Sequence, residues 1–503
     1  AVFQKTLADS AKMEAVVQLD NAVKQEKLAV QAQKTSEKLR YQAVAQSMAL
    51  RAIDVPDDQL RGVIAKQAYD FFIAYKEPEK QYNGDIYAGA YYGLKGLLKL
   101  DQYEKTPEEG RDAAAFRADS ALNQYHGHTQ AGPGREVVNV RSVTFSKDGS
   151  KMYSAGGDGR LLQWNFNDRS YIEVYSQSNV NRVVNISPNE RWLALGTSED
   201  EIDLFDLNDI FKEPKKLQGH QGAVYDLVFF DGNFGFASVG ADKKILLNSY
   251  NESVLLAELE STTKTIAISP DGKYLAAGSM NGEIILFDLE GESSPKKIVR
   301  KDMDIKPILD IKFSHNGEFL AIGGLNINNG LGYAFIWDRK NNTQYGPELM
   351  GFSAQVNDVE FSKDDFLLAA SSNDNSVRFW DLNPDNIYDL PTIILDHKGW
   401  VWDASFHPDG GYLVTAAEDG LLRRFPLKPT QMVDDLCNYI SRNMSDIEWR
   451  QYVGDVNEIP WVETCVGKIK PSDEASNSKI QVNSSSIKEK KLESNGVSKT
   501  ENK

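Results

Sequence analysis

The stretch SPDGKYLAAGSMNGEIILFDL, residues Ser269–Leu289, decides the fold of this chain. It contains two short apolar runs, with Asp-Gly before the first run and Asn-Gly before the second. Short apolar runs separated by such dipeptides predict antiparallel β-strands joined by tight turns. A stretch of this kind is either a single hairpin or one copy of a repeat, and a repeat would determine the architecture of the whole domain.

The same pattern occurs seven times between residues 126 and 428. In each copy the third strand ends at one aligned position, and these positions lie 39 to 50 residues apart. They are Trp164, Phe205, Asn248, Phe287, Trp337, Trp380 and Phe425. A period near 40 residues is typical of propeller blades, and a single blade cannot bury both of its faces, so the copies must stack around an axis. The sequence therefore predicts a mainly β fold with a seven-bladed β-propeller at residues 126–428.

The repeats resemble the WD40 family. Four third strands end in the family's Trp-Asp pair or in Phe-Asp, at Phe205, Phe287, Trp337 and Trp380. The Gly-His pairs at residues 127–128 and 219–220 match the motif that opens a blade of this family. The resemblance implies a seven-bladed WD40 propeller.

The resemblance also implies a hydrogen-bonded tetrad of His, Ser or Thr, Asp and Trp inside a blade. One blade has all four residue types at matching positions: His128, Ser154, Asp158 and Trp164. Two other blades match three positions, the first through His220, Ser238 and Asp242 with Asn248 in place of Trp, the second through His397, Thr415 and Asp419 with Phe425 there. These departures put the tetrad in doubt for most blades.

Helical segments flank the repeats. Residues 1–55 lack Gly and Pro, and Ala or Ser recurs every seven residues from Ala8 to Ala43. This pattern fits a coiled-coil stalk, through which the chain would form a homo-oligomer, and it fits equally a solvated helix whose weak apolar stripe rests on its own domain. Residues 56–125 predict a helical subdomain and residues 429–466 a short C-terminal helical segment. Residues 467–503 contain no aromatic residue and predict a disordered tail.

The flanking segments are similar to those of bacterial signal-transduction NTPases of the STAND type that carry WD40 arrays. The similarity lies in RYQAVAQSMALRAIDVPDDQLRGVIAKQAYDFF at residues 40–72 and in LCNYISRNMSDIEWRQYVG at residues 436–454. It implies a bacterial signalling or cell-envelope assembly, with an NTPase module and often a membrane segment upstream. The chain begins at Ala1 without Met, which predicts a processed protein or a fragment of a longer one. If the protein has a membrane tether, we expect it upstream of Ala1.

Composition and motifs exclude several functions. The net charge of -17 argues against nucleic-acid binding, and no run of about 18 apolar residues is long enough to span a bilayer. The sequence has no GxxxxGK[ST], HExxH or GxSxG motif and no paired CxxC. We therefore expect no cofactor, no metal site and no catalysis.

The two cysteines, Cys437 and Cys465, allow either one disulfide or two free thiols. A disulfide would favour the periplasmic face of a membrane-tethered assembly over the cytoplasm, so the localisation stays open.

Seven residues form a candidate partner-binding face. Each stands four positions before an aligned apolar residue in the first strand of its repeat: Arg141, Arg182, Tyr225, Lys264, Leu309, Asn357 and Trp402. Tyr, Trp and Arg are enriched at binding hot spots, and a basic and aromatic ring on an acidic protein predicts a site for an acidic peptide or partner loop. The alternative is that these are ordinary rim residues.

Acidic residues also recur in the first strands, at Asp226, Asp310, Asp358 and Asp403. Inward carboxylates would suit acid–base catalysis. In a repeat, however, the same residues are expected to tie turns or strand ends, and we favour this second interpretation.

Three hypotheses for the function follow from the sequence. The first is a non-catalytic module that binds a protein or peptide. The second is a propeller-type enzyme with a metal or carboxylate pair in its channel, and the third is a scaffold that oligomerises through the N-terminal helix.

Overall fold

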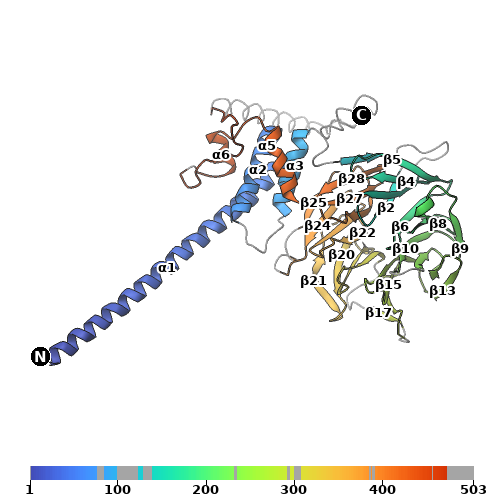
Figure 1. Ribbon diagram of the computed structural model, residues 1–503, viewed down its shortest axis with the longest axis horizontal. Coiled ribbons are helices and arrows are strands. Elements are labelled where there is room, and N and C mark those ends of the chain that lie inside the picture. Colours follow the sequence, from blue (N-terminus) through green and yellow to red (C-terminus); the bar gives the residue numbers. More distant parts are fainter. Residues whose placement is uncertain are drawn as a thin grey trace, which may run out of the picture. The chain divides into compact units, whose positions relative to one another are not determined.

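The computed structural model describes residues 2–75, 84–98, 123–128, 139–230, 235–291, 295–298, 307–384, 387, 391–455 and 457–472. The chain divides into two compact units (Figure 1). A helical unit contains residues 1–105 and 432–503, and a β unit contains residues 106–431. The predicted tail beyond residue 472 and the predicted helical residues 99–122 lie outside the described residues.

The β unit is a propeller of seven four-stranded antiparallel sheets, which we call blades 1 to 7 in chain order. Blade 1 comprises β2 (Val140–Phe145), β3 (Lys151–Gly156), β4 (Arg160–Asn165) and β5 (Tyr171–Ser176). Blade 2 comprises β6 (Asn181–Ile186), β7 (Trp192–Thr197), β8 (Glu201–Asp206) and β9 (Lys215–Gln218). Blade 3 comprises β10 (Val224–Phe229), β11 (Phe236–Gly240), β12 (Lys244–Asn248) and β13 (Ser253–Glu258). Blade 4 comprises β14 (Thr263–Ile268), β15 (Tyr274–Ser279), β16 (Ile284–Asp288) and β17 (Lys296–Ile298).

The last three blades follow the same order. Blade 5 comprises β18 (Ile308–Phe313), β19 (Phe319–Asn326), β20 (Leu331–Asp338) and β21 (Thr343–Leu349). Blade 6 comprises β22 (Val356–Phe361), β23 (Leu367–Ser372), β24 (Val377–Asp381) and β25 (Thr392–Ile394). Blade 7 comprises β26 (Val401–Phe406), β27 (Tyr412–Ala417), β28 (Leu421–Pro426) and the early strand β1 (Asn123–His126).

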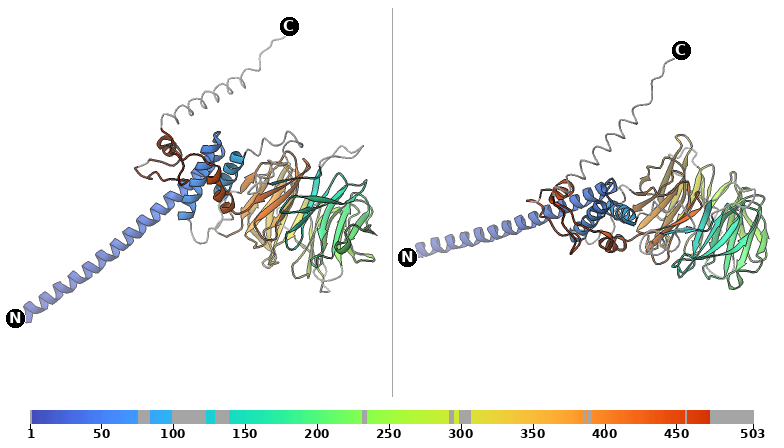
Figure 2. Two further views of the ribbon diagram at one scale, coloured as in Figure 1. Left: turned by 45° about the horizontal axis from the view of Figure 1, so that its top comes forward. Right: turned by 90° about the horizontal axis from the view of Figure 1, so that it is seen from above.

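The ring closes through β1. This strand pairs with β28, so that Tyr125 lies opposite Leu422 and the two ends of the propeller share one sheet. Each innermost strand contacts the next around the ring, and β26 of blade 7 contacts β2 of blade 1. Both views of Figure 2 show the blades following one another in sequence order, from cyan through green and yellow to orange. The predicted helical subdomain extended to residue 125, but Asn123–Tyr125 form a strand because they complete blade 7.

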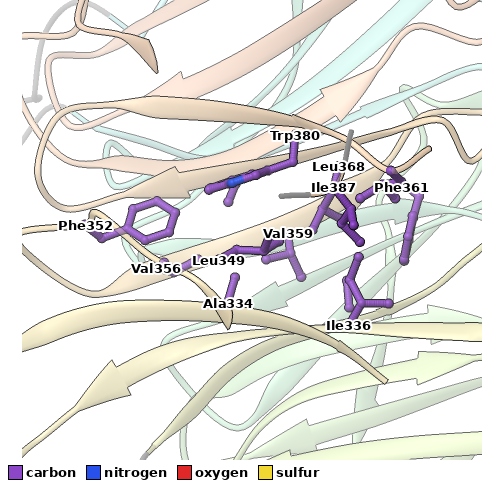
Figure 3. Close-up of a cluster of buried hydrophobic side chains, with 13 residues drawn as sticks. Ala334, Ile336, Leu349, Phe352, Val356, Val359, Phe361, Leu368, Trp380 and Ile387 are labelled. Atoms are coloured by element: carbon purple, nitrogen blue, oxygen red, sulfur yellow. The ribbon is translucent and has the colours of Figure 1, made fainter. Parts of the chain in front are cut away.

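The propeller core consists of apolar layers between adjacent blades. Figure 3 shows the layer between blades 5 and 6, where Ala334 and Ile336 of β20 face Val356 and Val359 of β22. Trp380 at the end of β24 closes this layer and is only 3% exposed. The aromatic residues predicted at the ends of the third strands are therefore core residues. They fill the space between the facing sheets of two adjacent blades.

The widest repeat spacing has a structural cause in blade 5. Strands β19 and β20 each contain eight residues, longer than the other strands of the propeller, and Gly330 in the turn between them has a φ of +72°. The extra residues therefore lengthen the hairpin formed by β19 and β20.

The helical unit is built on α1 (Val2–Ile53), α2 (Asp58–Tyr75) and α3 (Gly84–Leu98), which contact one another pairwise. Small residues permit close packing: a Cβ added at Gly89 would lie 2.9 Å from Cα of Ala49, and one at Gly93 would lie 2.9 Å from Cβ of Ala65. At this distance any larger side chain would force the helices apart.

The first half of α1 stands clear of the other helices of its unit (Figure 1). Ala22, Ala29 and Ala43 of the seven-residue pattern are exposed, whereas Ala45 and Ala49 are fully buried. The helix therefore packs within its unit through a different stripe, and the seven-residue stripe remains accessible. The coiled coil stays a prediction. Within the described residues, no helix is apolar over a length that would cross a membrane.

The C-terminal segment belongs to the helical unit from Met432 onward. It contains α5 (Pro429–Tyr439) and α6 (Asp446–Tyr452), followed by irregular chain. Cys437 and Cys465 form a disulfide, and the buried side chain of Asn443 donates to the carbonyls of Cys465 (3.0 Å) and Lys468 (2.9 Å). Lys470 pairs with Asp446 at 2.6 Å, so residues 467–472, expected in the disordered tail, are held against α6.

Candidate functional site

The seven residues predicted as a partner-binding face come together in the structure. They line one cavity of about 250 Å³ on the axis of the propeller, and each comes from the innermost strand of a different blade. We call this set the channel mouth: Arg141, Arg182, Tyr225, Lys264, Leu309, Asn357 and Trp402. Their role in binding stays a prediction.

A β-bulge places each of these residues. In blade 3, Val224 pairs with Gly240 and Asp226 pairs with Val239, so Tyr225 between them has no partner across the ladder. The same one-residue shift occurs at the corresponding position of every other blade. A bulge leaves one residue unpaired and re-aims its side chain, so seven bulges in a closed ring direct seven side chains to one opening.

Three cations share the channel mouth with two aromatic rings. The guanidinium carbon of Arg141 lies 4.2 Å from the ring centre of Trp402, and Nζ of Lys264 lies 3.3 Å from that of Tyr225. The guanidinium of Arg182 lies 5.4 Å from the same Tyr225 ring. These distances are within the range of cation–π attraction, which holds a cation without using its hydrogen-bond donors.

The cations also repel one another. Burial, together with the charges of Arg182 and Arg141, lowers the pKa of Lys264 to about 8. Burial likewise lowers the pKa of Arg141, again with a contribution from Arg182, while Glu418 acts in the opposite direction. The mouth is therefore a local positive site on an acidic protein.

The other polar residues of the mouth are held in place by hydrogen bonds. Nε1 of Trp402 donates to Oε2 of Glu418 at 2.5 Å, and the side chain of Asn357 donates to Oδ1 of Asn373 (2.6 Å) and to the carbonyl of Val401 (2.7 Å). Leu309 adds an apolar side chain.

Directly beneath the mouth, the residue that follows each bulge ties its blade to a neighbouring blade. In six blades its side chain accepts a hydrogen bond from a backbone N–H in the innermost strand of the next blade. The six pairs are Ser142 with Val184 (3.2 Å), Asp226 with Ile266 (2.8 Å), Thr265 with Ile311 (3.0 Å), Asp310 with Val359 (3.0 Å), Asp358 with Ala404 (3.1 Å) and Asp403 with Val143 (2.7 Å). We call these contacts the inter-blade ties.

The recurring aspartates predicted to tie turns or strand ends in fact tie neighbouring blades. Blade 2 is the exception, because Val183 occupies this position and cannot accept a hydrogen bond. The N–H of Leu227 in blade 3 is satisfied by Oδ1 of its own neighbour Asp226 at 2.8 Å instead. A polar residue at the same place in six of the seven repeats was the sequence signal for these ties.

The channel below holds carboxylates with shifted pKa values. Burial raises the pKa of Asp226 to about 6 and that of Glu360 to about 7, and it also raises the pKa values of Asp358 and Asp403. Burial lowers the pKa of Lys312, but the charges of the surrounding carboxylates raise it by more. The pKa of Lys312 is therefore well above its usual range.

Lys312 and Glu360 also line a second cavity of about 150 Å³. Among the residues that the structure describes, no group of three His, Cys, Asp or Glu side chains is placed to hold a metal ion.

The predicted tetrad of blade 1 forms a continuous hydrogen-bond chain. Nε2 of His128 lies 2.7 Å from Oγ of Ser154, which accepts from Nε1 of Trp164 at 2.8 Å. Nδ1 of His128 lies 3.0 Å from the carboxylate of Asp158. These four side chains are almost completely buried and connect the segment that follows β1 of blade 7 to β3 and β4 of blade 1.

The two incomplete tetrads differ in how they compensate. In blade 3, Nδ2 of Asn248 donates to Oγ of Ser238 at 2.8 Å and so replaces the missing tryptophan. In blade 7, Phe425 cannot donate, and Asp419 pairs with Arg423 at 2.8 Å.

A model of the WD40 family, described as WD domain, G-beta repeat, matches residues 121–165, 255–288, 346–381 and 390–425. Each match begins at the outer strand of one blade and continues through the first three strands of the next. This chain contains WD40 repeats. The WD40 propeller also includes blades 2, 3 and 5, whose innermost strands lie outside the matched residues but which have the same four-stranded topology.

Proteins similar to this chain include human Pre-mRNA-processing factor 17, 27% identical over 235 residues, which are 44% of this chain and 38% of that protein. The WD repeat-containing protein 26 homolog of Arabidopsis thaliana is 25% identical over 262 residues, 51% of this chain and 42% of that protein. Human Echinoderm microtubule-associated protein-like 3 is 25% identical over 306 residues, 60% of this chain and 32% of that protein.

The chain thus spans less than half the length of each of these relatives. All three are eukaryotic, and nothing in them indicates a bacterial signalling or envelope role. The similarity of the flanking helices to bacterial NTPases stays a prediction.

Proposed function

We propose that this protein is a non-catalytic interaction module that binds a protein or peptide partner at the channel mouth of its WD40 propeller. The observation that carries the proposal is the convergence of seven bulge residues on one opening. Trp402, Tyr225 and Arg182 there are partly exposed and belong to the residue types that dominate binding energy at interfaces.

The inter-blade ties support the same proposal. They fix the backbone directly beneath the mouth, for example through the 2.7 Å hydrogen bond between Val143 and Asp403. A preorganised surface loses little conformational freedom when a partner binds, so more of the contact energy contributes to affinity. The names of two relatives refer to different contexts, pre-mRNA processing and microtubules, as expected when one fold serves several functions.

Affinity capture from an extract of the protein's own cells tests this proposal. The mouth variant carries Arg182→Ala, Tyr225→Ala and Trp402→Ala. The control variant carries Tyr171→Ala, Phe211→Ala and Lys212→Ala, which alter one cation and two aromatic residues at other exposed positions. Circular dichroism and thermal unfolding first establish that both variants fold. We expect partners that bind the intact protein and the control but not the mouth variant, and identical partner sets for all three would refute the proposal.

One observation favours a second candidate function, acid–base catalysis in the channel. Glu360 has a pKa raised to about 7, lies beside Lys312, and lines both cavities. A carboxyl group whose pKa is near neutrality can serve as a general acid or base. A hydrolytic activity that is lost in Glu360→Gln, while partner capture is unchanged, would favour this candidate.

A further inference from the structure

We infer that the channel mouth binds an oxyanion of its partner, a phosphate group or a carboxylate, between Arg141, Arg182 and Lys264. The inference rests on the proposed function, because it specifies the chemistry of the partner that the mouth accepts. It follows from three observations: the cations lack partners, the aromatic rings leave their donors free, and the space between them suits one small group.

Among the residues that the structure describes, no carboxylate forms an ion pair with any of the three mouth cations. Among the described residues, none of their side chains makes a hydrogen bond or an ion pair, and the Nε atoms of Arg141 and Arg182 are buried without a partner. A buried donor without a partner is unfavourable, because it has lost its hydrogen bonds to water. A ligand oxygen would restore those hydrogen bonds.

Several other cations of the same propeller are paired. Arg160 lies 2.7 Å from Glu173, Arg378 lies 2.9 Å from Asp374 and Arg423 lies 2.8 Å from Asp419. Arg424 is also buried, but it lies over the rings of Phe166 and Tyr412 and makes no ion pair among the described residues. The mouth differs from these single arginines because three cations line one cavity, where an external group can reach them together.

The aromatic rings orient the cations without neutralising them. Trp402 supports Arg141, and Tyr225 supports both Lys264 and Arg182. A ring face attracts the charge but accepts no conventional hydrogen bond, so the N–H groups remain available to an oxyanion. Glu418 is the carboxylate whose charge acts on Arg141, and its influence is smaller than that of Arg182. Its Oε2 already accepts from Trp402.

The cavity and the charges beneath it limit what can bind. A volume of about 250 Å³ is below that of a pocket for a drug-sized ligand and suits the end of one side chain with a few waters. Further in, the same cavity is lined by the carboxyl groups of Asp226, Asp310, Asp358, Glu360 and Asp403. These groups would repel an anion that entered further, so the oxyanion would stay at the level of the three cations. Three cations balance a doubly charged phosphate better than a singly charged carboxylate, so we expect phosphate to bind more tightly.

Three pools of short degenerate peptides test the inference with the full-length chain. The pools are identical except for a central phosphoserine, glutamate or serine. The test variant carries Arg141→Gln, Arg182→Gln and Lys264→Gln. The control variant carries Lys147→Gln, Lys151→Gln and Lys212→Gln, which remove the same charge from exposed positions elsewhere on the propeller. If the test variant fails to fold, Lys264→Gln alone replaces it. Fluorescence anisotropy measures binding at constant ionic strength.

We expect the intact protein and the control to prefer phosphoserine over serine by about ten- to hundredfold, the range of one charge-assisted hydrogen bond, and the test variant to lose this preference. Equal preference for phosphoserine and glutamate over serine, lost in the test variant, supports the oxyanion site with a carboxylate as its source.

Equal binding of all pools, no binding of any pool, or a charge preference that survives in the test variant overturns the inference. If the pools bind equally while the alanine mouth variant still loses captured partners, the oxyanion inference fails and the proposed function stands.

Discussion

Replacing Glu360 with glutamine should stabilise the propeller at alkaline pH and leave it unchanged at acidic pH. The side chain lies in the channel, where its pKa is raised from 4.5 to about 7. Burial is the largest cause, the charge of Lys312 opposes it, and the charges of Asp403 and Asp310 add to it. In the folded chain the protonated form is therefore favoured, whereas the unfolded chain ionises at its ordinary pKa.

The sign and size of the effect follow from this difference. Below pH 4.5 the carboxyl group of Glu360 is protonated in both the folded and the unfolded chain, so its burial carries no cost of removing a charge from water. As the pH rises through the folded-state pKa of about 7, the folded chain must give up the proton and bury a charge, which lowers the unfolding free energy. A difference of this size corresponds to about 3 kcal/mol of unfolding free energy. Glutamine keeps the shape of the side chain and cannot ionise, so Glu360→Gln should gain about 3 kcal/mol at pH 8 and about zero at pH 4.

Urea unfolding at pH 4, 6 and 8, followed by the circular dichroism of the β-sheet, measures the effect for the intact protein and the variant. Glu260→Gln is a matched control at an exposed position. A gain that grows steadily with pH in Glu360→Gln, and no trend in the control, would support the reasoning. A variant that is destabilised at pH 8, or shifted equally at every pH, would show that burial of the ionised carboxylate is not the dominant effect.

Three further predictions concern other parts of the chain. Asp403→Ala leaves the buried N–H of Val143 without an acceptor and should lower the unfolding free energy by about 1 to 3 kcal/mol in urea titrations, and an unchanged midpoint would contradict the role of the inter-blade ties. Replacing both Cys437 and Cys465 by serine opens a link across 28 residues and should destabilise the helical unit by about 3 kcal/mol, with a matching loss when the intact protein is reduced; equal thermal unfolding of oxidised and reduced protein would argue against it. Deleting residues 2–36 should convert a concentration-dependent dimer into a monomer in light scattering, and an intact chain that is monomeric at every concentration would rule out oligomerisation through α1.

Much of the candidate site was accessible from the sequence, because aligned repeats place equivalent residues at equivalent positions in the fold. Counting back four positions from one apolar residue in each repeat identified Arg182, Tyr225 and Trp402 as members of one face, and all three line the mouth cavity. The bulges that aim these side chains were not visible, because a bulge appears only when two strands are paired and their register compared. The absence of ion-pair partners for Lys264 was equally inaccessible, since it depends on which carboxylates reach the mouth in space.

The sequence by itself determined the local elements and their sevenfold repetition, because strand alternation, turn dipeptides and helical composition act over a few neighbouring residues. Only the tertiary structure decided which distant segments combine. Asn123–His126 complete blade 7 by pairing with a strand about 300 residues later, and Thr464 donates a hydrogen bond to Gln67, 397 residues before it. Such pairings depend on which unsatisfied strand edge or apolar face meets another during folding, and no local pattern records that choice.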